Sequence, residues 1–385
     1  MTRAAVLATL TLLAAPAPAA AQETSALVIR LGRDTVSVER FVQGRDRVEI
    51  DQIGRSPRVL RRRFTYEYSG ERLLRLSMIV TPPGATAPTQ TIEGTTAGDS
   101  LRLRIQTAGQ PLRLETVHLP KGAVVAGATS PWSAYQSQTM KLVRAKADSV
   151  RSSIYFFGMP EAVWLSVRRL GRDSVDVLNG RGERFHARID GEGRILGVKP
   201  VEGTALYSVT RVHDLDMDAM AAFFAEEEAQ GHGLGALSPR DTVRVADAGG
   251  ATLWFDYGRP AKRGRVLFGE VVPWGRVWRT GANAATQFRT DRALDFGGVV
   301  VPAGFYSLWT LPQPDGWKLI VNRQTGQWGT QHDPEQDLHV AAMTVTRLPQ
   351  VVERFTISVE PRPDGGVLHF DWDTTRASAT FKTLR

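Results

Sequence analysis

The amino-acid sequence predicts a mainly β protein with two domains. We expect an N-terminal curved antiparallel sheet or half-barrel with one or two helices, followed by a C-terminal antiparallel β-sandwich of jelly-roll type. Apolar and polar residues alternate with period two over much of residues 26–212 and again from residue 240 onward. Glycine (36 residues) and proline (21 residues) separate these segments as turn residues do. Helical periodicity is rare, so βαβ units are not expected.

Residues 1–21 have the features of a secretory signal peptide. Arg3 supplies a positive charge, residues 4–13 form an apolar stretch, and a run of alanines ends at Ala21, where cleavage is expected. No later window has the roughly 20 apolar residues that a transmembrane helix needs. A buried N-terminal helix is the alternative, but two prolines inside the segment argue against it. We therefore expect a periplasmic or secreted protein that does not span the membrane.

The composition limits the kinds of site that the chain can hold. It has no cysteine, which rules out disulfides, thiol nucleophiles and cysteine–zinc sites. The net charge of +8 would suit a nucleic acid or an anionic membrane surface. However, the arginines are spread along the chain, and residues 61–63 alone form a run of three. We therefore interpret the charge as solvated strand faces and expect no nucleic-acid partner.

Residues 24–212 are expected to form the first domain. Phe64, Tyr66 and Tyr68 alternate with polar residues, as in a strand with one buried face. Residues 185–198 contain two alternating segments around a glycine-containing turn and form the clearest hairpin in the sequence.

Two helices are predicted beside these strands. The first runs from Ser133 to Arg151, directly after Pro131. Its buried side is expected to hold Tyr135, Met140, Val143 and Ala147. The second runs from Asp216 to Gln230, with acidic residues in its first turn and a glycine after its end. Residues 213–239 are thus a helix and a glycine-rich linker.

Residues 240–385 are expected to form the second domain, with about nine short strands. Six of the nine tryptophans of the chain lie between Trp254 and Trp328. Alternation places Trp254, Trp309 and Trp372 on regular strand faces. Most of these aromatic residues are therefore predicted to build the core of the sandwich.

The standard catalytic and cofactor motifs are absent from the sequence. It contains no G-x-S-x-G, H-E-x-x-H or P-loop motif, and no G-x-G-x-x-G motif between a strand and a helix. The spacing of Asp214, Asp216 and Asp218 matches the first positions of an EF-hand calcium loop. Alanines, however, occupy the positions where that loop needs its glycine and its bidentate glutamate. Carboxylates at the start of a helix explain the same triplet. No catalytic residue, cofactor or metal is therefore assigned.

The segment Trp278–Thr286 is the best candidate for a binding site. It combines an indole, the guanidinium of Arg279, the hydroxyl of Thr280 and the carboxamide of Asn283 with a glycine that permits a tight backbone path. These groups suit a carboxylate, a phosphate or a sugar. Alternatively, Arg279 and Asn283 satisfy buried backbone groups where a strand bends.

Two further loops could contribute to this site. Arg259 and Arg265 lie in a basic loop just upstream and would favour an anionic ligand if both loops meet at one end of the sandwich. His332 and Asp333 lie in a polar loop that follows Trp328, a composition that suits a metal or an acid–base pair. Loops of this composition are also often simply polar.

Several motifs in the C-terminal part of the chain carry a family resemblance. They are Asp256–Pro260, Lys262–Arg265, Phe268–Pro273, Trp278–Asn283, Pro302–Leu308, Trp317, Asn322, Gln327–Gly329 and Trp372. Over residues 240–382 the chain resembles DUF2911, a family of unknown function. The resemblance implies an exported bacterial β protein and supplies no catalytic residues. In its long strands and inserted helix, the first domain resembles periplasmic half-barrels of lipoprotein-carrier type.

Three functions are compatible with these observations. The first is non-enzymatic binding of an apolar, amphipathic or glycan ligand, so that a lipid, a glycan or a small anion would be the partner. The second is a hydrolase or isomerase of the cell envelope that uses Arg279, Asn283 and the loop with His332 and Asp333. The third is a structural envelope module that binds only proteins. The sequence does not predict an oligomeric state.

Overall fold

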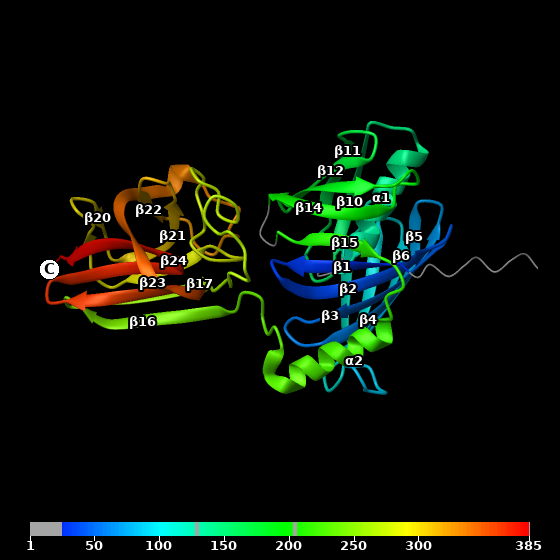
Figure 1. The fold of residues 1–385 in the computed structure, drawn as a ribbon, viewed down its shortest axis with the longest axis horizontal. Helices are drawn as coiled ribbons and strands as arrows, with labels where there is room; N and C mark the ends of the chain where they lie inside the picture. The colour runs from blue at the N-terminus through cyan, green and yellow to red at the C-terminus, as the bar shows by residue number, and fades with distance from the viewer. Residues whose placement is uncertain (1–24, 128–130, 203–205, 385) are drawn as a thin grey trace, which may run out of the picture.

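The computed structural model describes residues 25–127, 131–202 and 206–384. The expected signal peptide lies outside these residues. Two β-sheets and two α-helices make up most of the described chain, which confirms the mainly β fold (Figure 1). None of the helices in this part of the chain is long and apolar enough to cross a membrane.

The first sheet has fifteen strands in the order β8-β7-β6-β5-β4-β3-β2-β1-β15-β14-β13-β12-β11-β10-β9. Its strands are β1 (Ala26–Leu31), β2 (Asp34–Gln43), β3 (Arg47–Gly54), β4 (Leu60–Ser69), β5 (Arg72–Thr81), β6 (Gln90–Ala97), β7 (Ser100–Thr107), β8 (Arg113–His118), β9 (Val124–Ala126), β10 (Ser149–Phe156), β11 (Val163–Arg169), β12 (Ser174–Asn179), β13 (Arg184–Ile189), β14 (Ile195–Glu202) and β15 (Ser208–Val212). Neighbouring strands pair antiparallel except β9 and β10, which are parallel. The chain therefore proceeds to one edge, crosses to the other and returns, so that β1 pairs with β15 in the middle.

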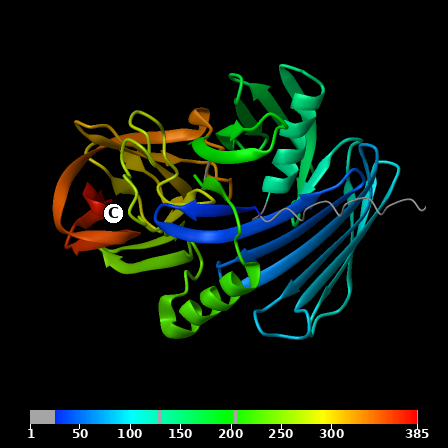
Figure 2. The ribbon, with the colours of Figure 1, turned by 45° about the vertical axis from the view of Figure 1, so that its right-hand side comes forward.

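This sheet is curved, as the blue-to-cyan strands in Figure 2 show. Cross-strand neighbours on one face are apolar; Phe64 pairs with Met78, which pairs with Ile92. Helix α1 (Trp132–Arg144) packs into the core that these residues form, through side chains that include Trp132 and Leu142. The helix contacts β9, β10 and β11, and a hollow of about 280 Å³ lies elsewhere on this side, beside Phe64, Met78 and Ile92. The predicted hairpin of residues 185–198 is confirmed as β13 and β14.

Helix α1 is shorter than predicted. Tyr135 and Met140 are buried as expected, but the helix ends at Arg144, and the prediction that it reaches Arg151 is wrong. Lys146 adopts a left-handed conformation with φ of 50°, which ends the helical path. Ala147 is therefore outside the helix, and the chain enters β10 two residues later.

Helix α2 (Met217–Glu227) follows β15 as predicted. The carboxylate of Asp216 accepts hydrogen bonds from the backbone N–H groups of Asp218 (2.9 Å) and Ala219 (3.0 Å), so this aspartate caps the helix. Phe224 is among the residues that pack the helix on the convex face of β1–β3. A π-helical turn, η1 (Glu228–His232), ends the element, and the chain then passes to the second sheet without regular structure.

The second sheet has nine strands in the order β16-β17-β18-β21-β22-β23-β24-β19-β20. They are β16 (Arg240–Ala248), β17 (Ala251–Gly258), β18 (Thr286–Thr290), β19 (Leu294–Asp295), β20 (Val300–Val301), β21 (Gly304–Leu311), β22 (Trp317–Asn322), β23 (Asp337–Arg362) and β24 (Gly365–Thr383). The start of β23 pairs with β22, and the strand then passes through bulges and pairs with β24. The sheet thereby folds over itself into a sandwich.

The tryptophans of the second domain occupy different environments. Trp278, Trp317 and Trp372 are buried in the main core. Trp309 is buried in a small separate cluster with Ala285 and Ile320. Trp254 lies on a strand face of β17 as predicted, but it is not among the residues that build the core. Its neighbours Leu253 and Phe255 face the core, and Trp254 points to the outer face, where it is partly exposed.

The two domains contact each other through the turn between β1 and β2. The guanidinium of Arg263, which is buried, forms an ion pair with Asp34. The backbone N–H of Arg33 donates to the carbonyl of Arg263 (3.0 Å). A Cβ on Gly32 would lie 2.2 Å from that same carbonyl oxygen, so glycine permits the close approach. These contacts fix the wall of a cavity that lies between the domains.

Candidate functional site

A cavity of about 390 Å³ lies where the two domains meet. Its walls come from the first domain, from the linker and from the second domain. The lining residues are Leu31, Ser56, Pro57, Leu206, Tyr207, Ala236, Leu237, Ser238, Pro260, Arg265, Val271, Val272, Trp278, Arg279, Gly281, Ala282, Asn283 and Trp372. The volume is within the range of sites that bind small molecules.

The segment Trp278–Thr286 forms one wall of this cavity and is held by many backbone hydrogen bonds. Trp278 and Thr310 exchange N–H to carbonyl bonds of 2.7 and 2.9 Å. The N–H of Gly329 donates to the carbonyl of Asn283 (2.9 Å), and the hydroxyl of Thr286 donates to the carbonyl of Thr280 (2.6 Å). The segment is therefore a rigid part of the loop that connects β17 and β18.

The Arg279 guanidinium enters the cavity and has no hydrogen-bond or ion-pair partner among the described residues. Its side chain is partly buried, and its Nε and Nη1 atoms are fully buried with no hydrogen-bond acceptor among the described residues. Burial lowers the pKa of Arg279 to about 10, so the group stays cationic at neutral pH. The approach of Gly329 fixes its position, since a Cβ there would lie 2.1 Å from Cδ of Arg279. Arg279 is thus a desolvated cation that lacks an acceptor.

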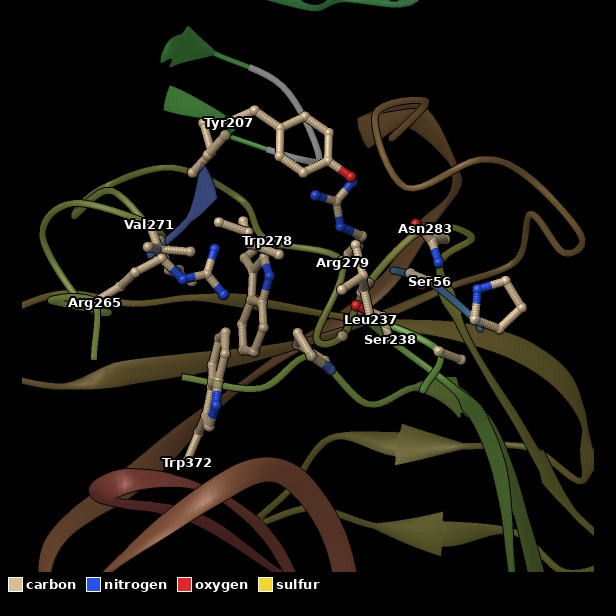
Figure 3. Close-up of a pocket in the computed structure, with 18 residues that line it drawn as sticks. Ser56, Tyr207, Leu237, Ser238, Arg265, Val271, Trp278, Arg279, Asn283 and Trp372 are labelled. Carbon is tan, nitrogen blue, oxygen red and sulfur yellow. The ribbon is translucent and has the colours of Figure 1, made fainter. Parts of the chain in front are cut away.

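Arg265 and Tyr207 complete the polar part of the wall. Figure 3 shows Tyr207 entering the cavity from the first domain and Arg279 entering it from the second. The guanidinium of Arg265 donates to the carbonyls of Lys262 (3.1 Å) and Ala261 (2.6 Å). Desolvation lowers the pKa of Arg265, and the neighbouring charge of Arg263 adds to this effect. Desolvation likewise raises the pKa of Tyr207, so its hydroxyl keeps its proton at neutral pH.

The charge of the cavity wall is positive. Two arginines line it, and none of the described lining residues is Asp, Glu or His. The indole of Trp278 contributes an apolar surface and stacks on Trp372, with ring centroids 5.8 Å apart and an angle of 12° between the planes. The cavity therefore offers a cationic end beside aromatic and aliphatic side chains, an arrangement that suits an amphipathic anion.

Four of the candidate residues from the sequence lie together at this cavity: Arg265, Trp278, Arg279 and Asn283. The carboxamide of Asn283 is exposed beside it, on a backbone with φ of 63°. Thr280 is adjacent but fully buried, and its hydroxyl lies 3.2 Å from that of Thr310. Thr280 therefore supports the loop and does not line the cavity.

Arg259 is bound within its own domain. Its guanidinium pairs with Asp241 (2.9 Å) and donates to the carbonyl of Phe355 (3.1 Å) and to the hydroxyl of Thr356 (3.0 Å). It is not among the residues that line the cavity. The two ends of the basic loop thus have different roles, since only Arg265 reaches the site.

The loop that follows Trp328 does not contribute to the cavity either. His332 lies 2.9 Å from the carboxylate of Asp337 and packs on the ring of Trp309. Asp333 caps a short 3-10 helix, η2 (Pro334–Gln336), by accepting from the N–H of Glu335 (3.0 Å). Trp328 is partly exposed near these residues. Within the described residues, no group of three or more His, Asp or Glu side chains could hold a metal ion.

Sequence reasoning missed the part of the wall that comes from outside the second domain. Leu31, Ser56 and Tyr207 belong to the first domain, and Leu237 and Ser238 to the linker. No motif marks these residues. They line the cavity where the β1–β2 turn contacts the loop of Arg263, and these segments are far apart in the sequence.

The fold and the cavity define a β-rich protein of two sheets, with a cationic cavity where the two sheets meet. Residues 238–381 match the family described as "Protein of unknown function (DUF2911)", which confirms the resemblance over this part of the chain. A comparison with curated proteins finds no match.

Two solved structures show a distant similarity. One is a DUF1089 family protein from Pseudomonas aeruginosa, with 14% identity over 43% of this chain and 90% of its own, and a TM-score of 0.30. The other is a β-barrel-like protein of the domain of unknown function DUF1849 from Brucella abortus, with 8% identity over 50% of this chain and 96% of its own, and a TM-score of 0.31.

Proposed function

We propose that this protein is an exported binding protein that holds a small amphipathic anion between its two domains. The head of the ligand, a carboxylate or a phosphate, contacts Arg279. The apolar part of the ligand lies along Trp278, Val271 and Leu237. The observation that carries the proposal is the Arg279 guanidinium, whose buried Nε and Nη1 atoms have no acceptor among the described residues.

A buried guanidinium without acceptors costs free energy, because its N–H groups lose water and gain nothing in return. Guanidinium presents a planar fork that matches a carboxylate or a phosphate. A ligand with such a head would supply the missing acceptors and the missing negative charge. The unliganded protein thus carries a cost that binding of an anion removes.

The remainder of the wall favours an amphipathic ligand over a bare inorganic anion. Leu31, Leu237 and Val271 are aliphatic, and Tyr207 and Trp278 are aromatic. The cavity of about 390 Å³ is larger than a single phosphate or carboxylate needs. An apolar body would contribute to affinity by burial against these side chains.

Binding is better supported than catalysis. The hydrolase or isomerase alternative needs a base within hydrogen-bond reach of the ligand. The described lining residues include the hydroxyls of Ser56, Tyr207 and Ser238 but no histidine or carboxylate that could activate them. His332 and Asp333, which were the candidate bases, are engaged with Asp337 and with the 3-10 helix. A module that binds only proteins would leave the cationic cavity without a role.

Calorimetric titration of the full mature chain tests the proposal. The probes are octyl phosphate and octanoate, with octanol and octyltrimethylammonium as neutral and cationic controls. We expect the two anions to bind and the two controls not to bind. Arg279→Met should weaken anion binding about tenfold to a hundredfold, the equivalent of losing a charge-assisted hydrogen bond. Arg323→Met removes an exposed arginine outside the cavity and should leave binding unchanged. Equal binding of octanol, or full affinity in Arg279→Met, would reject the proposal.

Export is the second part of the proposal, and residues 1–21 support it. The full-length chain should be processed when it is expressed in a bacterium, and the mature chain should begin at Gln22. Intact mass measurement of protein from the periplasmic fraction checks this. A full-length product that stays in the cytoplasm would contradict it.

A further inference from the structure

The outer face of the second domain carries a row of alternating arginine and aromatic side chains. Arg244 on β16 pairs with Trp254 on β17, Trp254 pairs with Arg289 on β18, and Arg289 pairs with Phe305 on β21. Cross-strand partners lie on the same face of a sheet, so all four side chains project on one side. We call this set the Arg–Trp row.

The Arg–Trp row lies on the part of the outer face that is open. Further along the same face, the loop of residues 323–336 covers the sheet. There, Gln327 donates to Ser307 (2.8 Å) and the N–H of Gly326 donates to Gln287 (3.0 Å). In contrast, Phe305 is 47% exposed and Arg244 and Arg289 are exposed. One end of the face is thus closed by the protein itself, and the other is left bare.

The row bounds a shallow hollow of about 610 Å³. The rings of Trp254 and Phe305 approach to 6.0 Å between centroids at an angle of 47°, above the strand that separates them. Thr252 and Asp291 line the same hollow beside the rings. The carboxylate of Asp291 accepts from the N–H of Thr252 (2.7 Å), and this hydrogen bond lowers the pKa of Asp291, so it is ionised at neutral pH. The hollow therefore offers aromatic faces, two cations and one hydrogen-bond acceptor.

The two arginines of the row are free to contact a ligand. Neither Arg244 nor Arg289 forms an ion pair or a hydrogen bond with another described residue through its side chain, in contrast to Arg240 on the same strand, which pairs with Asp256 (2.8 Å). Strand spacing places the backbones of Arg244 and Arg289 about 9.5 Å apart, since one strand lies between them. Two guanidiniums on one face, each without a described partner, suit a polymer with repeated negative charges.

We infer that the Arg–Trp row binds an acidic polysaccharide, a chain of sugar rings that carry carboxylates. The aromatic rings would stack on the apolar faces of the sugars, the two arginines would bind carboxylates, and Asp291 would accept hydrogen bonds from sugar hydroxyls. This occupant fits better than a nucleic acid. The carboxylate of Asp291 repels a polyanion of either kind, but each sugar ring of a polysaccharide carries several hydroxyls that can donate to it, whereas a DNA strand has almost none.

Affinity electrophoresis and calorimetry with four polymers test this inference. Polygalacturonate is the acidic polysaccharide, and a neutral cello-oligosaccharide presents sugar without charge. Polyglutamate presents carboxylates without sugar, and oligothymidylate presents phosphates with bases. We expect the full mature chain to bind polygalacturonate at least about tenfold more tightly than any of the other three.

Single substitutions assign the binding to the row. Trp254→Ala and Arg289→Met should each weaken polygalacturonate binding about tenfold. Both side chains contact solvent, so the fold should persist; Phe305→Ala, at a side chain that is 47% exposed, provides a third independent variant. Arg347→Met removes an exposed arginine from β23 and should have no effect. Arg279→Met should also have no effect, which separates this surface from the cavity between the domains.

Each other outcome overturns the inference. Equal binding of polyglutamate would mean that charge alone is recognised, and preferential binding of oligothymidylate would assign the surface to nucleic acid. Binding of polygalacturonate that survives all three row substitutions would place the polymer elsewhere on the protein. Absence of binding to all four polymers would remove the inference altogether, whatever the result for octyl phosphate in the cavity.

Discussion

Replacement of Arg279 by methionine should stabilise the unliganded protein while it destroys the proposed site. Burial lowers the pKa of this arginine to about 10, which corresponds to a desolvation cost of roughly 3 kcal/mol for the charged form. No described acceptor offsets this cost at Nε and Nη1. Methionine keeps an unbranched apolar stem against Gly329 and carries no charge. Part of the gain is lost with the arginine's own packing, so the free energy of unfolding should rise by roughly 1–3 kcal/mol.

Urea unfolding followed by tryptophan fluorescence measures this change, because Trp278 is adjacent. The exposed arginine variant Arg323→Met serves as the control and should change the free energy of unfolding by less than about 0.5 kcal/mol. The pH dependence gives a second check. The folded state binds the proton of Arg279 less tightly than the unfolded state does. The charged arginine therefore lowers the free energy of unfolding by its full amount below about pH 9, and this loss of stability should shrink as the pH rises through 10. A variant that is less stable than the wild type at neutral pH would refute the reasoning.

Three further predictions concern other parts of the molecule. Burial raises the pKa of Glu39 to about 8, although a hydrogen bond from the backbone of Ser133 partly opposes this. The wild type should therefore lose stability as the pH rises from the ordinary range of a glutamate to about 8. Glu39→Gln should be roughly 4 kcal/mol more stable at pH 9 and equal at pH 4 in urea unfolding, and a pH-independent difference would contradict this. Gly329→Ala places a Cβ 2.1 Å from Cδ of Arg279, so the arginine side chain must move. Titration with octyl phosphate should then show at least a tenfold loss of affinity. Unchanged affinity would show that the contact with Gly329 does not hold the Arg279 side chain. Arg263→Met leaves Asp34 with only the exposed Arg33, 3.8 Å away, as an ion-pair partner. Calorimetry should then show a loss of about 3 kcal/mol and two separated melting transitions, and a single unchanged transition would refute a stabilising interface.

The strands were predictable where local chemistry decides the conformation. Alternation in residues 185–198 was sufficient to identify a hairpin, because one face of each strand is buried. Acidic residues in the first turn likewise indicated the start of α2, and the structure shows that Asp216 caps this helix. The end of α1 was not predictable in the same way. The helical pattern of the sequence continues to Arg151. The residue with the left-handed conformation that ends the helix is Lys146 and not the glycine that usually marks a helix end.

The site was predictable only in part. The residue types around Arg279 indicated an anion, and the structure places Arg265 at the same cavity. Arg259 and Arg265 looked equivalent in the sequence. In the structure, Asp241 on the neighbouring strand β16 forms an ion pair with Arg259 and keeps it away from the cavity. The contribution of Tyr207 depends on how the two domains dock. The contact between the domains could not be predicted from the sequence, because no motif links the two segments that form it.

The central pairing of β1 with β15 also determines the order in which the first domain can be completed. As the chain emerges from its N-terminal end, β1 finds β2 early, but its other edge stays open until the last strand of the domain is available. That edge belongs to a strand in which Ala26, Leu27, Val28 and Ile29 are all buried in the finished protein. An open apolar edge is a template for aggregation. A chain interrupted after β14 would keep this template exposed, so the first domain depends on its last strand to protect its first.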